Sequence, residues 1–257
     1  MAKPSKNRER AERIEALRRE SQRAERRRTL VVVLVCGVLA LAIVGATAWK
    51  LISDAQRADE IAGTDLAAIG ADADAADCRD VTTAGAEAQG EHLDGQPIDY
   101  TDYGTTPPAF GPHWSNAAEF GRTFYTEQDR PEVQQLVHNL EHGYTVLWYN
   151  ETIAGDDEAM QTIQDLAQKF EVGEATDITD QETYNSGKFI AAPWTAEDGE
   201  FPADANVVLA HWASEGEDAV EGQGMGVWQS CEQPSGEAVA SFMAEYPASN
   251  SPEPNGA

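Results

Sequence analysis

The sequence predicts an α+β fold: a small mixed sheet covered by helices, with an N-terminal single transmembrane helix and a long loop rich in proline and aromatic residues. Three observations lead to this prediction. An uncharged apolar run lies near the N-terminus, apolar residues recur at helix and strand spacings after residue 130, and residues 98–128 have no regular period.

The anchor is predicted from the 21 uncharged residues between Arg28 and Lys50. At a rise of about 1.5 Å per residue, a helix of this length crosses a hydrocarbon core of about 30 Å. We therefore expect a transmembrane helix over 29–51. Residues 46–48 resemble a signal-peptidase site, but the apolar part of a signal sequence is shorter, roughly 7 to 15 residues. We expect an uncleaved anchor, and cleavage is the alternative.

Charge divides the chain at the anchor. Residues 1–28 carry 11 Lys/Arg and five Glu, whereas the rest carries seven Lys/Arg and 40 Asp/Glu. The positive-inside rule then predicts a single-pass protein of the cell membrane, with a basic cytoplasmic arm and an extracytoplasmic domain. Contact with anionic lipid headgroups explains the arm without nucleic acid. Nucleic acid is also disfavoured as a partner of the acidic domain, because like charges repel.

Composition divides the part of the chain after the anchor. Residues 52–75 are rich in Ala and Asp and have little to bury, so they are expected to form a linker. Residues 249–257 are expected to form a disordered tail. Residues 76–248 hold five of the six tryptophans and are long enough for one globular domain.

Two of the three cysteines bracket that domain. Cys36 lies inside the anchor, where it is most simply an apolar packing residue. A disulfide between Cys78 and Cys231 would tie the start of the domain to its end, in a compartment that permits such bonds. Two free thiols remain the alternative, because a disulfide requires Cα atoms within about 7 Å.

The first helix of the domain is predicted to open at Pro131 and to end at Gly143, a favourable C-cap residue. Its apolar residues recur at positions i, i+3, i+4 and i+7, the spacing of one buried face. These residues are Val133, Leu136, Val137 and Leu140.

The remaining elements follow from the same periodicities. Strands are expected at residues 144–149, 188–192 and 206–212, and helices near 156–171 and 235–246. The resulting order of helix, strand, helix, strand, strand, helix is typical of an α+β layer.

Four of the five histidines lie between residues 92 and 142: His92, His113, His138 and His142. His138 and His142 are four residues apart, so both rings lie on one helical face, roughly opposite the apolar stripe. The loop that ends at His113 is the expected cover for that face. The fifth histidine, His211, stands on a predicted strand and is expected in the core or at its edge.

This cluster predicts a transition-metal site, with zinc or copper as the ion. His113, His138 and His142 supply three nitrogens, and His92 a fourth. Glu141 either binds the ion or orients an imidazole ring. The alternative is a layer of histidines that make hydrogen bonds only. We expect a binding role rather than an enzymatic one, in metal handling or envelope maintenance.

Two further functions are weighed against the metal site. The segment His138-Asn139-Leu140-Glu141-His142 matches the H-x-x-E-H of inverted zinc peptidases, in which the glutamate is the general base. Gly143, however, ends the helix too early for that site. A third ligand is not singled out either, because three downstream glutamates lie at a plausible distance: Glu215, Glu217 and Glu221.

The other alternative is a metal-free module that binds an envelope protein, a glycan or a lipid headgroup through an aromatic platform. The rings in question are those of Tyr100, Tyr103, Phe110, Trp114 and Phe120. Packing of these rings against the sheet would explain them without a partner.

The tract from Pro107 to His113 (PPAFGPH) and the segment from Val137 to Gly143 (VHNLEHG), before a Tyr/Trp-rich strand, resemble the domain-of-unknown-function family 3105. The family usually has Ser after Pro-Pro-Thr, so residues 109–110 depart slightly from it. The resemblance covers about residues 76–248. It implies a bacterial, largely actinobacterial protein with one N-terminal membrane anchor, and it implies no activity.

Overall fold

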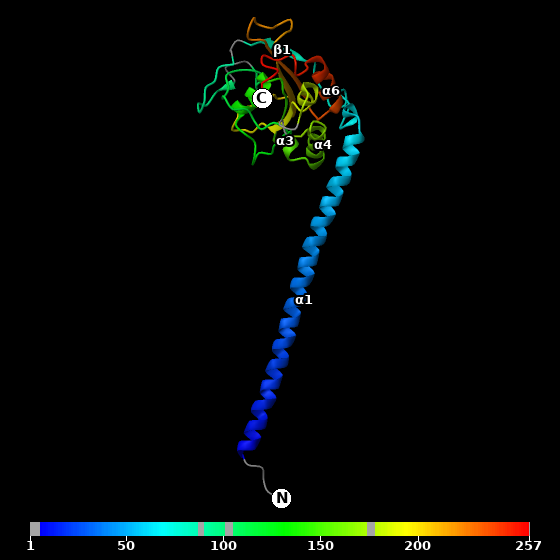
Figure 1. Ribbon diagram of the computed structural model, residues 1–257, viewed down its shortest axis with the longest axis vertical. Coiled ribbons are helices and arrows are strands. Elements are labelled where there is room, and N and C mark those ends of the chain that lie inside the picture. The colour runs from blue at the N-terminus through cyan, green and yellow to red at the C-terminus, as the bar shows by residue number, and fades with distance from the viewer. Residues whose placement is uncertain (1–5, 87–89, 101–104, 174–177, 257) are drawn as a thin grey trace. The chain divides into compact units, whose positions relative to one another are not determined.

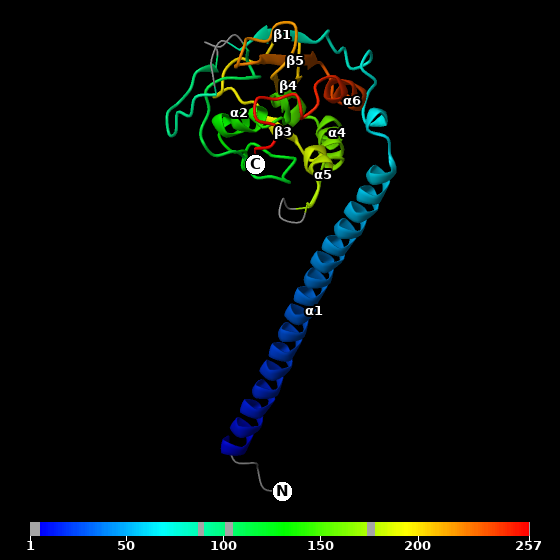
Figure 2. The same ribbon diagram turned by 45° about the horizontal axis from the view of Figure 1, so that its top comes forward.

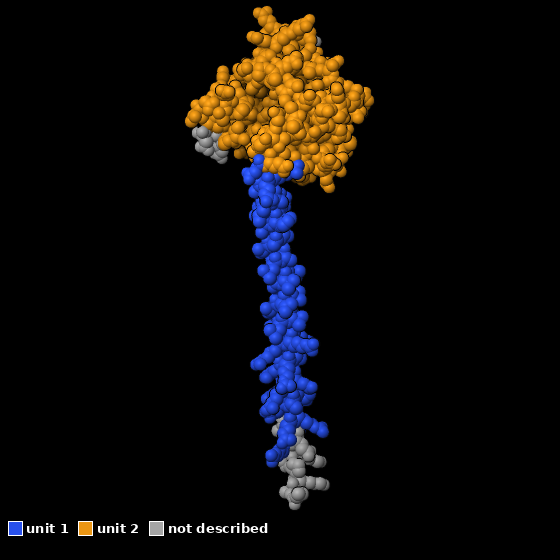
Figure 3. All heavy atoms as spheres, turned by 90° about the vertical axis from the view of Figure 1, so that its right-hand side faces the viewer, with its two compact units in different colours: residues 1–59 blue, residues 60–257 orange. Residues whose placement is uncertain are grey.

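The computed structural model describes residues 6–86, 90–100, 105–173 and 178–256 (Figure 1). The chain forms two compact units, residues 1–59 and 60–257 (Figure 3).

Helix α1, Lys6–Gly63, contains the predicted anchor. Among the described residues it is the one helix that is long and apolar enough to cross a membrane. The leucines, isoleucines and valines between residues 30 and 52 are exposed to their surroundings. Lipid is the environment that accommodates such side chains, so the helix fits a single-pass membrane anchor.

The second unit is built on a five-stranded sheet in the order β1-β5-β4-β2-β3. Its strands are β1 Thr82–Gly85, β2 Thr145–Tyr149, β3 Phe189–Pro193, β4 Val207–Ala213 and β5 Met225–Cys231. Strands β2 and β3 are parallel, and the other neighbours are antiparallel. The sheet is therefore mixed, and the predicted α+β class is confirmed.

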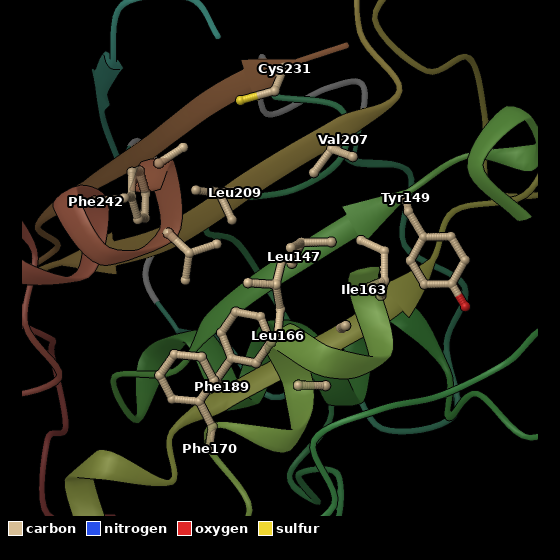
Figure 4. Close-up of a cluster of buried hydrophobic side chains, with 14 of the residues drawn as sticks. Leu147, Tyr149, Ile163, Leu166, Phe170, Phe189, Val207, Leu209, Cys231 and Phe242 are labelled. Atoms are coloured by element: carbon tan, nitrogen blue, oxygen red, sulfur yellow. The ribbon is translucent and has the colours of Figure 1, made fainter. Parts of the chain in front are cut away.

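Helices cover one face of this sheet (Figure 2). They are α3 Glu151–Ala154, α4 Asp157–Gln168, α6 Gly236–Glu245 and the short 3-10 helix η1 Leu66–Ala68. Figure 4 shows Ile163 and Leu166 of α4 and Phe242 of α6 in one cluster with Leu147 and Leu209 of the sheet. A further helix, α5 Gln181–Ser186, precedes β3.

The opposite face of the sheet is covered by helix α2, Val133–Glu141, and by the loop that leads to it. Successive residues of a strand point to opposite faces. Leu147 therefore belongs to the core beneath α4, whereas Val146 and Trp148 belong to the core beneath α2. Both faces of the sheet are buried, and α2 packs against one of them.

The structure differs from the predicted linker over 52–75. Helix α1 continues to Gly63, and Ile61 and Ile69 are buried in the core of the second unit. Lys169 fixes the end of the helix by donating to the carbonyls of residues 61, 62 and 64 at 3.1, 3.1 and 2.8 Å. Ile61, Ile69 and the hydrogen bonds of Lys169 hold this Ala/Asp-rich stretch against the core, and composition did not reveal this.

The predicted disordered tail, residues 249–257, also differs from the structure within its described part, 249–256. Ser251 is buried, and the Glu253 amide donates to the Glu141 carbonyl at 2.9 Å. Backbone and side-chain hydrogen bonds hold this segment, so its polar composition is no guide to its order. We refer to residues 247–256 as the C-terminal segment.

The structure brings Cys78 and Cys231 together as predicted. Their sulfurs lie 2.04 Å apart, at disulfide distance, and their Cα atoms lie 4.0 Å apart. The neighbouring Arg79 amide donates to the Ser230 carbonyl at 2.8 Å. The segment before β1 is thereby held to the end of β5. Cys36 is an exposed free cysteine of α1.

Candidate metal centre

Helix α2 carries three of the chemically important side chains on one side and its apolar residues on the other. Leu136 and Leu140 are fully buried against the sheet. His138, Glu141 and His142 lie on the side away from it, yet each is only 6–7% exposed. Their side of the helix is therefore covered, as predicted.

Helix α2 ends at Glu141 with His142 as its C-cap, and the next residue, Gly143, has a φ of 87°, the left-handed conformation that favours glycine. The Tyr144 amide donates back to the Asn139 carbonyl at 3.1 Å, and the chain turns directly into β2. This tight end fixes the last turn of α2, where Glu141 and His142 stand.

His113 reaches the centre from the loop. A short parallel bridge pairs it with His92, because the His113 amide donates to the Glu91 carbonyl at 3.0 Å and the Leu93 amide to the His113 carbonyl at 2.8 Å. The ring of His113 is fully buried. His92 is exposed, and its ring stacks on that of His138 with centroids 5.4 Å apart.

Three imidazole rings have their Nδ1 atoms against backbone carbonyls. His113 Nδ1 lies 2.9 Å from the Gly111 oxygen, and His138 Nδ1 lies 2.5 Å from the Trp114 oxygen. His142 Nδ1 lies 3.0 Å from the Glu253 oxygen. A carbonyl only accepts, so a proton on each Nδ1 satisfies all three contacts. That tautomer leaves the three Nε2 atoms without protons.

The Nε2 atoms face other acceptors. His138 Nε2 and His142 Nε2 are 2.7 Å apart. His113 Nε2 lies 3.0 Å from Glu141 Oε2 without the alignment of a hydrogen bond, and it is a buried nitrogen with no hydrogen-bond partner. Buried polar atoms rarely lack a partner, and a site that binds an ion is one reason for an exception. Lone pairs that converge in this way are the arrangement that a cation would fill.

The number of protons on His138 and His142 also indicates a place for a cation. Between the Trp114 and Glu253 carbonyls, the rings of His138 and His142 make three contacts in a row. Two neutral imidazoles carry only two protons. Whatever the tautomers, one contact lacks a proton unless a cation occupies it or a ring is protonated. Burial opposes the second solution at His138, because it lowers the pKa of that imidazole.

The charge of Glu141 is favoured despite its position. Burial raises the pKa of this carboxyl, but the interaction with His113 and the nearby His138 and His142 rings outweigh burial and lower the pKa overall. Glu141 is therefore an ionised carboxylate among imidazoles at neutral pH, the form in which it binds a metal ion.

The structure groups the candidate ligands slightly differently from the sequence. His92, His113, His138 and Glu141 each offer a ligand atom, and these atoms all lie within 4.8 Å of one another. His142 lies outside that group but adjoins it through His138 Nε2, and it forms a second group with Glu141 and Glu253. All four predicted histidines meet here, with Glu141 as a candidate ligand of equal standing.

Sequence reasoning did not identify Glu253, Gly90 and Gly256. A Cβ on Gly90 would overlap Glu141 Oε1, and a Cβ on Gly256 would overlap the His142 ring. The backbone therefore approaches the centre closely from two sides. No motif in the chain points to these contacts, because they join segments more than 50 residues apart in sequence.

The aromatic loop packs inward over the part that the structure describes. Phe110 is 1% exposed and contacts Trp212 edge to face, and Tyr100 donates to the Pro112 carbonyl at 2.8 Å. Trp114 and Phe120 are partly buried. Tyr103 lies outside the described residues. Packing therefore explains the buried rings of Tyr100 and Phe110.

The peptidase interpretation gains no support from the geometry. Glu141 Oε2 lies 3.0 Å from His113 Nε2 and the residue is only 7% exposed, so this carboxylate lies inside the cluster. Neither group of potential ligands among the described residues contains Glu215, Glu217 or Glu221. His211 is fully buried in β4, with its nitrogens 3.1 Å from the Tyr144 oxygen and 2.9 Å from the Asn250 oxygen.

Comparisons with known proteins agree with the resemblance drawn from the motifs. No curated protein and no solved structure matched the chain. A family model described as "Protein of unknown function (DUF3105)" matches residues 92–257, which include the four clustered histidines, Glu141 and Glu253. Compared with the 76–248 expected from the motifs, the match begins later, at residue 92, and extends further, through the C-terminal segment. The chain therefore belongs to the DUF3105 family, whose members have no established function.

Proposed function

We propose that this chain is a membrane-anchored protein whose outer domain binds one transition-metal ion between α2 and the loop of His113. The observation that carries the proposal is the convergence of three histidine Nε2 atoms and the Glu141 carboxylate at one buried point. Three backbone carbonyls fix the rings in that tautomer. Metal-binding histidines in proteins are commonly oriented by such an outer hydrogen bond.

The donor set selects the class of ion. Imidazole nitrogens with one carboxylate suit zinc or copper, whereas calcium and magnesium take oxygen ligands. The proposed ligands are His113, His138, His142 and Glu141, and His92, stacked on His138, is a further donor at the same point. Four protein ligands favour a structural or storage role over catalysis, which needs an open coordination position. Metal handling is the role that we infer.

We place this centre outside the cytoplasm. The basic residues before the anchor support a cytoplasmic N-terminus, with the acidic remainder on the other side. The disulfide-distance pair of Cys78 and Cys231 suits an oxidising compartment. Both copper and zinc are compatible with that location.

The test is metal binding by the full-length chain purified in detergent. We expect about one zinc or copper ion per chain by elemental analysis after titration and gel filtration. The double variant His138→Ala/His142→Ala should lose the ion and keep its far-UV circular dichroism. Glu132→Gln, which removes a carboxylate at the other end of α2, is the matched control and should bind as the wild type does. Stoichiometric metal in the double variant would refute the proposed site.

A further inference from the structure

Lys188 is a lysine with no exposed surface, next to the first residue of β3. Its Nζ atom donates to the His142 carbonyl at 2.7 Å and to the Pro254 carbonyl at 2.6 Å. The ammonium also lies 4.8 Å from the centre of the Tyr184 ring. Lysine is almost never fully buried without partners, so these contacts account for its position.

Lys188 thus holds two chain segments that meet at the metal centre. One is the end of α2 at His142, and the other is the C-terminal segment at Pro254. The residue before Pro254 is Glu253, whose carbonyl faces His142 Nδ1 and whose amide donates to the Glu141 carbonyl. The lysine therefore fixes both sides of the contact that sets the tautomer of His142.

The rest of the C-terminal segment is fastened independently. The Asn250 side chain accepts from the amides of Ser214 and Glu215 at 3.1 and 2.9 Å. Beyond Asn250, Lys188 holds the segment at Pro254, and Tyr184 holds its end by donating to the Gly256 carbonyl at 3.3 Å. Residues 251–256 can therefore lose their hold on His142 while the segment stays attached at Asn250.

We propose that Lys188 is a positioning residue of the metal centre: by clamping the His142 and Pro254 carbonyls, it keeps the Glu253 carbonyl on His142 Nδ1 and leaves His142 Nε2 free for the ion. This inference rests on the proposed metal site. It adds a role for a lysine that touches no ligand atom of the ion, and it makes the C-terminal segment a part of the centre. Losing such an outer hydrogen bond weakens metal binding by about 10- to 100-fold in known sites.

The test compares three variants of the full-length chain in detergent: Lys188→Met, a chain that ends after Asn250, and the two changes combined. The zinc dissociation constant comes from competition with a chromophoric chelator, and the visible spectrum of the cobalt-loaded protein reports the coordination geometry. Each single change should weaken zinc binding by about 10- to 100-fold and alter the cobalt spectrum. The combined variant should bind zinc as tightly as the single variant that has the lower zinc affinity. Both changes release the same contact, so their effects should not add.

Lys169→Met is the matched control. Lys169 also donates to several backbone carbonyls, at residues 61, 62 and 64, but away from the metal centre. Its loss should leave the zinc affinity and the cobalt spectrum unchanged. A change in affinity or in spectrum as large as that of Lys188→Met would show that loss of stability alone explains the effect, and it would overturn the inference.

Other outcomes separate the two claims. Wild-type affinity and spectrum in Lys188→Met, or fold-losses that multiply in the combined variant, would overturn the positioning role and leave the metal site standing. Absence of zinc and copper binding in the wild type would refute both. If Lys188→Met lost its near-UV circular dichroism, the chain ending after Asn250 would decide, because it keeps the lysine. Full zinc affinity in that chain would contradict the inference.

Discussion

At the scale of single residues, the proposed centre depends on which nitrogen of each imidazole ring carries the proton. The imidazole rings of His113, His138 and His142 each contact a carbonyl through Nδ1, so their Nε2 atoms are available as ligands. The spacing of His138 and His142 was readable from the sequence, as was the presence of Glu141 between them. The carbonyls of residues 111, 114 and 253 were not, because any residue supplies a carbonyl and only the fold selects which one arrives.

Substitution of Gly90 tests whether zinc binding requires the close approach of the backbone to Glu141. In Gly90→Ala the new Cβ would overlap Glu141 Oε1, the end of a side chain that can turn away. We expect the free energy of unfolding to change little, while zinc affinity falls at least tenfold as the carboxylate is displaced. Chelator competition and urea unfolding measure the two effects. Gly63→Ala, where no atom lies near the new Cβ, is the control. Unchanged zinc affinity in Gly90→Ala would place Glu141 outside the centre.

At the scale of secondary-structure elements, apolar periodicity predicted the helix and the strands whose side chains pack in the core. The expected helix from Pro131 became α2, and the three expected strands became β2, β3 and β4 within one residue at each end. Strands β1 and β5 were missed, because TTAG and MGVWQSC show no clear alternation. Both lie at one side of the sheet. There, pairing with a neighbouring strand stabilises the extended conformation even though the β-propensity of the sequence is weak.

The end of α2 provides a test at this scale. Gly143→Ala would put a Cβ in the left-handed region and against the backbone oxygen of Ala248, which cannot move as a side chain does. We expect a loss of about 1–3 kcal/mol in the free energy of unfolding. Urea denaturation followed by circular dichroism measures it. Gly155→Ala, at a helix end with φ of −89°, should cost far less. Equal costs would mean that Gly143 is replaceable.

At the scale of the whole molecule, composition predicted the anchor but misjudged the limits of the folded unit. The second compact unit runs from residue 60 to 257, beyond the predicted 76–248 at both ends. A fragment cut at the predicted limits would lose Ile61 and Ile69 from the core and Glu253 from the proposed metal centre. Long-range docking by a few side chains leaves no compositional trace, which is why the sequence could not reveal it.

Stability against acid is a property of the whole fold. Burial lowers the pKa of His138, and the surrounding imidazoles lower that of Glu141 against the effect of burial. The unfolded chain therefore takes up these protons first as the pH falls. The stability that His138 contributes is present above its ordinary pKa of 6.5 and is lost below it.

We therefore expect the urea midpoint of the metal-free protein to decrease as the pH is lowered from 7.5 to 5.5. Glu141 adjoins His138 and adds to this response at lower pH, because its pKa is also lowered. His138→Asn should flatten the pH dependence without abolishing it, because burial also lowers the pKa of His211. A midpoint that rises toward acid pH would contradict the assigned protonation states.

X-ray absorption at the metal edge, on full-length protein loaded with one equivalent of zinc or copper, tests the proposed centre most directly. We expect about four nitrogen or oxygen neighbours near 2.0–2.1 Å, with the outer-shell scattering of at least two imidazole rings. His138→Ala/His142→Ala should lose that imidazole pattern. An ion surrounded only by oxygen, or a pattern unchanged in the double variant, would contradict the claim that this histidine cluster is a metal centre.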